Sequence, residues 1–242
     1  MVALNTSLTS VDIRIIARNR MLFYLETVDV HSGDATWVSC DSVINSAGLW
    51  AGNLARMFHS SSSNNNNNNN NTPQQYFAKG TYFRLQGNSP NFQQLIYPVP
   101  EPGGLGVHAT IGWNVADKTG SGTNAVKFGP DVEWLSTTTD PDDISYLPDP
   151  ARGEEFYAEI AKYWPGIMED GISLQADYIG VRPKLSHPGL CGEGVLPFQD
   201  FYIAGKETHF IPGLIHLMGM ESPGLTSSMA VAEHVSGMLL EH

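Results

Sequence analysis

The feature that most constrains the fold is a strand-like segment that runs directly into a glycine turn and a helix. Residues 36–46 are rich in β-branched and aromatic side chains and end in the run Asn45-Ser46-Ala47-Gly48. From residue 49 to residue 58, apolar side chains return at the spacing of one helix face. A strand, a glycine turn and a helix in this order are typical of nucleotide-binding folds, so we expect an α/β domain.

Strand and helix patterns continue on both sides of this segment. Residues 21–30 are strand-like, and the turn at 31–34 joins them to the strand at 36–46 as a hairpin. Glycine-punctuated strand patterns between residue 76 and about residue 131 predict an antiparallel sheet. Further elements are expected as helices at 151–164 and about 224–240, and as strands at 176–181 and 201–204.

Composition restricts the partners of the chain. Its 242 residues are 41% apolar, which is enough to bury a core in one or two domains. The net charge of -12 repels phosphate backbones and anionic lipid surfaces, so we expect no nucleic-acid partner. An anionic substrate would therefore need a local cationic pocket.

Other site types are disfavoured by spacing. Cys40 and Cys191 stand far apart, which predicts neither a disulfide framework nor a zinc knuckle. The histidines form no metal-binding pair, so no metal site is expected. No apolar run of about 18 residues occurs, so no transmembrane segment is expected. The Gly-Lys-Glu-Thr run at 205–208 lacks the upstream glycine of a phosphate loop, and the glycines at 103–106 indicate a turn.

A low-complexity tract interrupts the chain after the first predicted helix. Four serines at 60–63 precede eight asparagines at 64–71, and none of these side chains can build a core. We interpret residues 59–75 as a disordered surface insertion, since a longer loop costs little closure entropy. An interaction or aggregation segment is the alternative.

Six short motifs together resemble one family. In order they are NSAGLWA at 45–51, KGTY at 79–82, YPVP at 97–100 with GVH at 106–108, YWPG at 163–166, GVRPK at 180–184 and GMESPGLTSS at 219–228. They resemble the L-2-hydroxyglutarate dehydrogenase and oxidase family, within the D-amino-acid-oxidase-like flavoproteins. The resemblance implies FAD as cofactor and a small dicarboxylate hydroxy acid as substrate, oxidised from L-2-hydroxyglutarate to 2-oxoglutarate by hydride transfer to the flavin. It is compatible with a mitochondrial location and leaves the electron acceptor open.

Two alternatives to this activity remain. The first is an FAD-dependent amine oxidase of the glycine or sarcosine type, although the GMESPGLTSS run favours the hydroxy-acid branch. The second is a non-catalytic fragment that serves as a folding or interaction module.

The resemblance assigns the cofactor to two glycine-containing turns. Ala47 and Gly48 match the turn where a small residue lets the backbone approach FAD. Gly219 and the run before the last helix would meet the flavin ring with free N–H groups at a helix start. That run consists of Ser222, Pro223, Gly224, Leu225 and Thr226. An ordinary serine-capped helix is the alternative for it.

The resemblance also suggests substrate-binding residues. Arg182 matches the arginine that grips a substrate carboxylate in relatives, where a planar guanidinium suits a carboxylate, and a structural ion pair is the alternative. Lys184 would share its strand face and reach a second carboxylate, unless it is solvated. Tyr82 and Tyr97 could line the pocket or pack in the core. His108 and His209 are the candidate catalytic bases, because oxidation of the hydroxyl releases a proton, and either could instead be structural.

We therefore expect an α/β protein with two domains. Residues 1–58 and 200–242 would form a partial, Rossmann-like FAD-binding domain, with residues after Phe201 packed on the strand that ends at Ser46. Residues 76–199 would form a substrate domain with a mixed or antiparallel sheet, and the site would lie between the domains. The family places a G-x-G-x-x-G loop in its first strand-turn-helix, whereas the first glycine here is Gly33. The chain thus resembles the C-terminal part of such an enzyme.

The missing glycine loop generates a prediction for the isolated chain. Without that loop the FAD pyrophosphate loses several charge-assisted hydrogen bonds, each worth about 1.5–3 kcal/mol. The 242-residue chain should therefore purify with substoichiometric flavin, measured from its visible absorbance, and show negligible L-2-hydroxyglutarate oxidation. Adding an upstream segment with the glycine loop should restore both. Stoichiometric, tightly held FAD in the isolated chain would contradict this expectation.

Overall fold

The computed structural model describes residues 2–17, 20–61, 72–87, 92–99, 106–113, 124–191 and 199–240. The asparagine tract at 64–71 and the glycines at 103 and 104 lie outside these ranges. The chain divides into two compact units. The first combines residues 1–76 with residues 183–242, and the second comprises residues 77–182.

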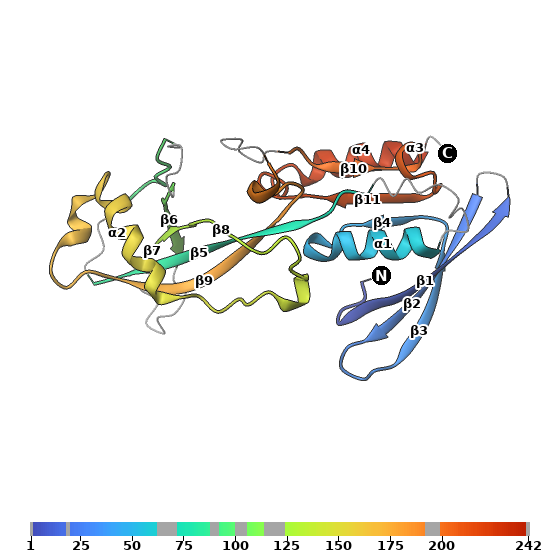
Figure 1. The fold of residues 1–242 in the computed structure, drawn as a ribbon, viewed down its shortest axis with the longest axis horizontal. Helices are drawn as coiled ribbons and strands as arrows, with labels where there is room; N and C mark the ends of the chain where they lie inside the picture. The colour runs from blue at the N-terminus through green and yellow to red at the C-terminus, as the bar shows by residue number, and fades with distance from the viewer. Residues whose placement is uncertain are drawn as a thin grey trace. The chain divides into compact units, whose positions relative to one another are not determined.

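The first unit is built around a small sheet between two helices. Its strands lie in the order β10 (Tyr202–Ala204), β11 (Leu214–Met218) and β4 (Val43–Asn45), with β10 antiparallel and β4 parallel to β11. Helix α1 (Ala51–Ser61) lies on one face of this sheet and α4 (Ser228–Leu240) on the other (Figure 1). The expected return of the chain after Phe201 to the strand ending near Ser46 is therefore confirmed.

Alternation along β11 explains why both faces are covered. Leu214, His216 and Met218 face α1, whereas Ile215 and Leu217 face α4. In α1, Ala55 and Phe58 are fully buried, at the spacing expected for one helix face. The strand, turn and helix predicted from residues 36–58 are thus present, with a 3-10 turn η1 (Gly48–Trp50) before α1.

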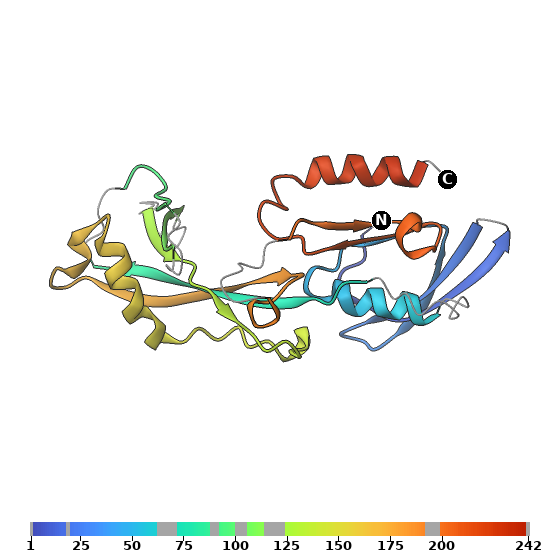
Figure 2. The ribbon, with the colours of Figure 1, turned by 45° about the horizontal axis from the view of Figure 1, so that its top comes forward.

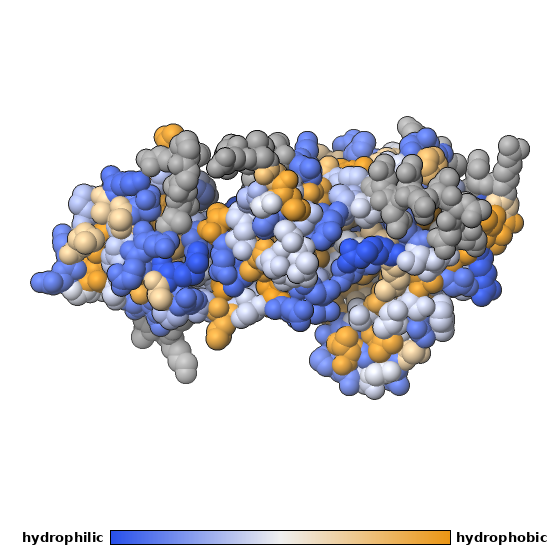
Figure 3. Space-filling view, viewed as in Figure 1, coloured by the Kyte–Doolittle hydropathy of each residue, from blue (hydrophilic) through white to orange (hydrophobic). Residues whose placement is uncertain are grey.

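A separate antiparallel sheet packs on the other side of α1. It consists of β1 (Thr6–Ala17), β2 (Arg20–Asp29) and β3 (Ala35–Cys40). Val11, Ile13 and Phe23 pack against Phe58 of α1, and Figure 2 shows the sheet beside that helix. Strand β3 is exposed along most of its length, with Trp37 at 53%, and Figure 3 shows hydrophobic and polar residues mixed on this part of the surface.

The prediction of one continuous strand at 36–46 is wrong in one respect. The segment forms two shorter strands, and these belong to different sheets. β3 ends at Cys40 in the antiparallel sheet, and β4 begins at Val43 in the other sheet. Between them the backbone meets Gly213, whose carbonyl accepts a hydrogen bond from the Val43 N–H at 2.8 Å. This hydrogen bond lies where the chain leaves the antiparallel sheet and begins to pair with β11.

The second unit contains the expected antiparallel sheet. Its strands are β6 (His108–Trp113), β7 (Asn124–Gly129), β5 (Tyr76–Gln86) and β8 (Glu133–Trp134), and β9 (Ser173–Lys184) also pairs with β5. One face of the sheet buries Phe83, Val126 and Phe128 against Phe156 and Ile160 of α2 (Gly153–Ala161). The remaining short helices of the chain are η2 (Pro141–Asp143), η3 (Pro150–Arg152), η4 (Pro165–Met168), η5 (Pro188–Leu190) and α3 (Lys206–His209).

Helix and unit boundaries differ from the expected ones for local reasons. α2 ends at Ala161 because the chain turns before Pro165 and continues as η4. α4 begins at Ser228, since residues 222–227 form a series of turns.

The chain rejoins the first unit at residue 183, where the expected boundary was about 200. Lys184 is paired with Glu221 there, and Leu185 packs against Gly219. Within the described ranges, no helix has the length and apolar character that crossing a bilayer requires.

The strand transition generates a prediction about Gly213. A Cβ there would lie 2.5 Å from the Asp41 carbonyl oxygen, and the residue has φ +81°. Gly33 has nearly the same conformation, φ +77°, but no atom lies within 4 Å of the position that a Cβ would take. Gly33→Ala should therefore cost only the left-handed backbone strain, about 1–2 kcal/mol. Gly213→Ala should cost roughly 1–3 kcal/mol more because the contact must be relieved. Equal losses in the free energy of urea unfolding would contradict the role given to this contact.

Candidate functional site

The turn after β4 is held by a buried carboxamide. Asn45, 2% exposed, donates from Nδ2 to the Ala51 carbonyl at 2.8 Å and to His216 Nδ1 at 3.1 Å. Its Oδ1 accepts from the Ala47 N–H at 3.3 Å. Gly48 then adopts φ +58°, with open space where a Cβ would lie. The backbone of this turn is thus fixed and can be approached closely, as a cofactor-binding turn requires.

Gln75 holds the same turn from a distant point in the sequence. Its Oε1 accepts from the Gly52 N–H at 2.6 Å, and its Nε2 donates to the Gly48 carbonyl at 2.9 Å. The residue is only 7% exposed. Sequence reasoning missed it, because Gln75 stands at the end of the region interpreted as an insertion and belongs to no motif.

The second glycine-containing turn is anchored by an ion pair. Glu221 pairs with the Lys184 ammonium at 2.6 Å, and both side chains are mostly buried, at 18% and 19% exposed. Beyond it, the Pro223 carbonyl accepts from the Thr226 hydroxyl at 3.0 Å and from the Ser227 N–H at 3.0 Å. Lys184, expected to contact substrate, therefore has a carboxylate of the glycine-containing turn as its partner.

Both turns reach one cavity of about 540 Å³ in the first unit. Ser46 and Gly48 come from the first turn, and Met220 and Gly224 from the second. The rest of the lining is mostly apolar and comes from β4, β11 and one side of α4, namely Ile44, Leu217, Ser228, Val231, Ala232, Val235, Ser236 and Leu239. Two of the predicted cofactor residues, Gly48 and Gly224, thus share a wall. A flat, largely apolar ring system fits the chemistry of this lining.

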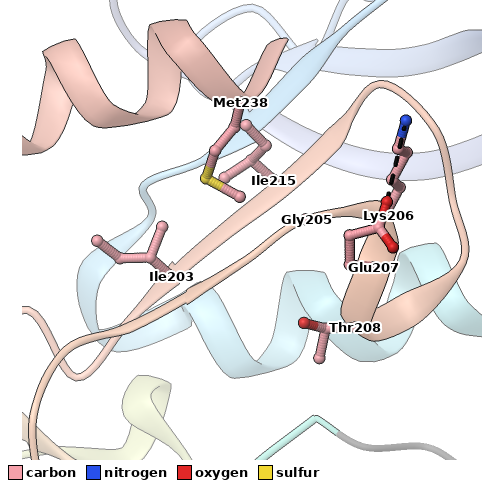
Figure 4. A pocket seen from close by; sticks show the side chains of 7 residues that line it. All are labelled: Ile203, Gly205, Lys206, Glu207, Thr208, Ile215 and Met238. Carbon is pink, nitrogen blue, oxygen red and sulfur yellow. Dashed lines mark ion pairs between the residues drawn. The ribbon is translucent and has the colours of Figure 1, made fainter. Parts of the chain in front are cut away.

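A smaller cavity lies beside Met238, near the C-terminal end of α4. It has a volume of about 300 Å³ and is lined by Ile203, Gly205, Lys206, Glu207, Thr208, Ile215 and Met238 (Figure 4). The Lys206 ammonium and the Glu207 carboxylate are 4.0 Å apart. The run that superficially matches a phosphate loop forms the four-residue helix α3, so its backbone does not form a phosphate cradle.

His209 belongs to a cluster of three imidazoles on the α1 side of the sheet. Its ring centroid lies 5.8 Å from that of His59 and 5.2 Å from that of His216. Nδ1 accepts from the Ile211 N–H at 3.2 Å, which leaves Nε2 to donate to the Ala204 carbonyl at 3.3 Å. Burial lowers the pKa of His209 to about 4 and that of His216 to about 3. Because the cavity between the two glycine turns lies on the α4 side, His209 faces away from it.

The second unit brings together the other four predicted substrate-site residues. Strand alternation directs Tyr82 on β5 and Arg182 on β9 to the face of the sheet opposite α2. On that face the rings of Tyr82 and Tyr178 stack at 4.5 Å, with an interplanar angle of 11°. The Tyr97 and His108 rings lie 4.2 Å apart. We call Tyr82, Tyr97, His108, Tyr178 and Arg182 the aromatic face.

Electrostatics distinguish His108 within the aromatic face. Burial lowers the pKa of the His108 imidazole, and the charge of the nearby Arg182 lowers it further. An ordinary histidine has a pKa of about 6.5, so His108 is uncharged at neutral pH. Burial also raises the pKa of Tyr82, so that its phenol keeps its proton. The arrangement offers a carboxylate-binding cation beside a neutral imidazole that can accept a proton.

Three further charged side chains on this sheet escaped sequence reasoning. The Asp177 carboxylate accepts a hydrogen bond from Arg84 at 2.6 Å and forms an ion pair with Lys127 at 2.7 Å. Lys127 also lies over the Tyr178 ring, 4.9 Å from its centroid. Alternating polar residues in these strands indicate a polar face on the sheet. The sequence does not give the register of β5, β7 and β9, so it could not show that these three side chains meet. In the part of the chain that the structure describes, no group of three or more His, Cys, Asp or Glu side chains is arranged to hold a metal ion.

Comparison with protein families gives one match that spans almost the whole chain. Residues 9–238 match the FAD dependent oxidoreductase family (DAO). The chain belongs to this family. The resemblance expected from the six motifs is therefore confirmed at the family level.

Two further proteins refine this assignment. The mitochondrial L-2-hydroxyglutarate dehydrogenase of Arabidopsis thaliana is 45% identical over 203 residues, which cover 82% of this chain and 37% of that enzyme. A glycerol-3-phosphate dehydrogenase from Bacillus halodurans, solved with FAD, matches 96% of this chain and 38% of its own length with a TM-score of 0.53. At 14% identity the second comparison concerns the fold alone. The chain thus spans little more than a third of the length of either protein.

The effect of the Arg182 charge on His108 generates a prediction on the pKa of the imidazole. Arg182→Met should raise the pKa of His108, because one of the two causes that lower it is removed, yet burial should keep it below about 6.5. Arg182→Lys keeps the charge and should leave the pKa close to that of the unmodified chain. Titration of the His108 ring signals by NMR measures all three values. An unchanged pKa in Arg182→Met would show that the two side chains do not interact.

Proposed function

We propose that the chain is part of an FAD-dependent dehydrogenase that oxidises a 2-hydroxy acid, with L-2-hydroxyglutarate as substrate and 2-oxoglutarate as product. The observation that carries this proposal is the presence, on one aromatic face, of the Arg182 cation and of a His108 imidazole whose pKa is lowered by burial and by the charge of Arg182. The Arg182 guanidinium suits a carboxylate, and the His108 imidazole suits removal of a hydroxyl proton. Membership of the DAO family supports FAD-dependent oxidation, and the 45% identity to an L-2-hydroxyglutarate dehydrogenase supports this substrate.

FAD, when bound, supplies the acceptor for the hydride that leaves C2 of the substrate. Residues of this chain do the remaining work. Arg182 binds the carboxylate next to the reacting carbon through two parallel N–H bonds and so orients the C2–H bond. His108 accepts the hydroxyl proton as the C2–O bond becomes a carbonyl. The substrate thus loses a hydride from C2 and a proton from its hydroxyl group, as oxidation to a ketone requires. Tyr82 and Tyr97 line the aromatic face.

We assign the cofactor contacts of this chain to the first unit. Ala47 and Gly48 offer a close backbone approach, and Gly219 permits the left-handed turn, φ +65°, that leads into the second glycine-containing segment. In that segment, Ser222, Pro223, Gly224, Leu225 and Thr226 precede α4, and the backbone N–H groups of Leu225 and Thr226 would suit the electron-rich edge of a flavin. Pro223 has no N–H, and the Gly224 N–H donates to the Glu221 carbonyl, so these two residues shape the turn. The Lys184–Glu221 pair anchors these residues. We also propose a mitochondrial location, because the Arabidopsis relative is a mitochondrial enzyme.

Kinetics of the chain extended by an upstream segment with the glycine loop and saturated with FAD, called the FAD-loaded protein from here on, test the proposed function. Arg182→Met should lower kcat/KM for L-2-hydroxyglutarate by about 30- to 3,000-fold, since a charge-paired carboxylate contact is lost. His108→Gln should lower kcat by roughly 100- to 10,000-fold, with loss of the pH-dependent step assigned to the imidazole. Arg182→Lys, which keeps the charge but not the planar fork, should fall between Arg182→Met and the unmodified protein.

Two results would contradict the proposal. One is an Arg182→Met variant with unchanged kcat/KM. The other is faster oxidation of glycine or sarcosine than of L-2-hydroxyglutarate by the unmodified protein, which would favour an amine oxidase.

A further inference from the structure

A second cationic group lies on the same sheet and has no role in the proposed function. Arg84 on β5 and Lys127 on β7 are directly opposite each other in the strand register. The Asp177 carboxylate on β9 bridges them, at 2.6 Å and 2.7 Å. The exposed fractions of their side chains are 38%, 27% and 14%, so the group is partly shielded and still reachable from solvent. We call Arg84, Lys127 and Asp177 the bridged pair.

A row of side-chain contacts runs from the bridged pair to Tyr82, whose pKa is raised mainly by burial and lowered in part by the charge of the nearby Arg182. Lys127 lies 4.9 Å from the centre of the Tyr178 ring, and Tyr178 stacks on Tyr82 at 4.5 Å. Tyr178 and Arg182 are on the same side of β9, four residues and therefore about 13 Å apart along the strand. Two stacked aromatic rings thus form a floor with a cationic group near each end. The distance between the charged groups of Lys127 and Arg182 can be shorter than this backbone distance, because both side chains are long.

The charges of this surface suit a dianion. Arg84, Lys127 and Arg182 are cations, and Asp177 compensates one of them, which leaves two positive charges in a chain whose net charge is -12. The Lys127 ammonium has three N–H donors, of which the Asp177 carboxylate engages at most one. The Arg84 guanidinium has five N–H donors. The bridged pair therefore keeps donors for a second carboxylate.

We propose that the bridged pair binds the distal carboxylate of a dicarboxylate substrate while Arg182 binds the carboxylate next to the hydroxyl-bearing carbon. This inference rests on the proposed function, because it assigns the far end of the same substrate. Lys127 is the specificity-determining residue, since its ammonium faces both Asp177 and the aromatic floor. The site then selects dicarboxylic over monocarboxylic 2-hydroxy acids.

The alternative role of the bridged pair is structural, because Asp177 joins three strands. The two roles differ in a measurable way. A structural defect would impair a dicarboxylic and a monocarboxylic substrate equally, whereas loss of a distal contact affects only the dicarboxylic one.

The test compares two substrates in the FAD-loaded protein. For Lys127→Met, kcat/KM for L-2-hydroxyglutarate should fall about 10- to 100-fold, the range expected for one charge-assisted hydrogen bond. That for L-2-hydroxybutyrate, which lacks the distal carboxylate, should stay within about twofold. Lys127→Arg should retain most of the discrimination. Lys162→Met is the matched control: it also removes a lysine from the second unit, where Lys162 pairs with Glu159 on α2, and should leave both values unchanged. Equal losses for both substrates in Lys127→Met would overturn the inference.

A binding measurement separates this inference from the proposed function. Glutarate carries both carboxylates but no hydroxyl group, so its binding requires no oxidation. In calorimetric titrations, glutarate should bind more tightly than butyrate, and Lys127→Met should remove the difference. If the protein oxidises neither hydroxy acid while this glutarate preference holds, the proposed function fails and the dicarboxylate site stands. If glutarate and butyrate bind alike, the dicarboxylate site is refuted whatever the protein oxidises.

Discussion

The buried side chain of Asn45 joins three elements of the first unit, and the geometry of the glycine turn depends on it. Its amide bonds the start of α1 through the Ala51 carbonyl, the central strand β11 through His216, and the turn itself through the Ala47 N–H. A buried carboxamide with these partners cannot be replaced by an apolar residue without leaving polar groups unpaired, each costing about 1–3 kcal/mol. Gln75 adds a second set of bonds to the same turn. The backbone is therefore rigid before any cofactor arrives, as a preorganised binding site requires.

The second unit uses the two faces of one sheet for different purposes. Phe83 and Phe128 pack on α2 and stabilise the unit, while the neighbouring residues Tyr82, Arg84 and Lys127 point to the opposite side. Because successive residues alternate, the packing of one face fixes the register that brings the polar side chains of the other face together. The substrate-site candidates are thus positioned by core residues that never touch substrate.

The sequence predicted those parts of the molecule whose signals are local. The strand, glycine turn and helix at residues 36–58 follow from periodicity, and the family follows from the six motifs. Strand β1 was missed although Val11 and Ile13 alternate with polar residues, and the break between Cys40 and Val43 depends on Gly213, which is distant in the sequence. Among the candidate site residues, Arg182, His108, Tyr82 and Tyr97 were named from motifs. Lys127, Asp177 and Gln75 were not, because their roles arise from strand register and from a loop that returns to the turn. Lys184 and His209 were named from sequence neighbours, whereas the Glu221 partner of Lys184 and the His59 ring beside His209 come from distant parts of the sequence.

The central claim is that residues of this chain support hydride transfer from a 2-hydroxy acid to FAD. The most direct measurement mixes the FAD-loaded protein, without oxygen, with one equivalent of L-2-hydroxyglutarate and follows the visible absorbance of the flavin. The account predicts loss of the oxidised-flavin absorbance in a single turnover, with one molecule of 2-oxoglutarate formed for each flavin reduced. A flavin that stays oxidised with L-2-hydroxyglutarate, or that is reduced by glycine or sarcosine instead, would contradict the account.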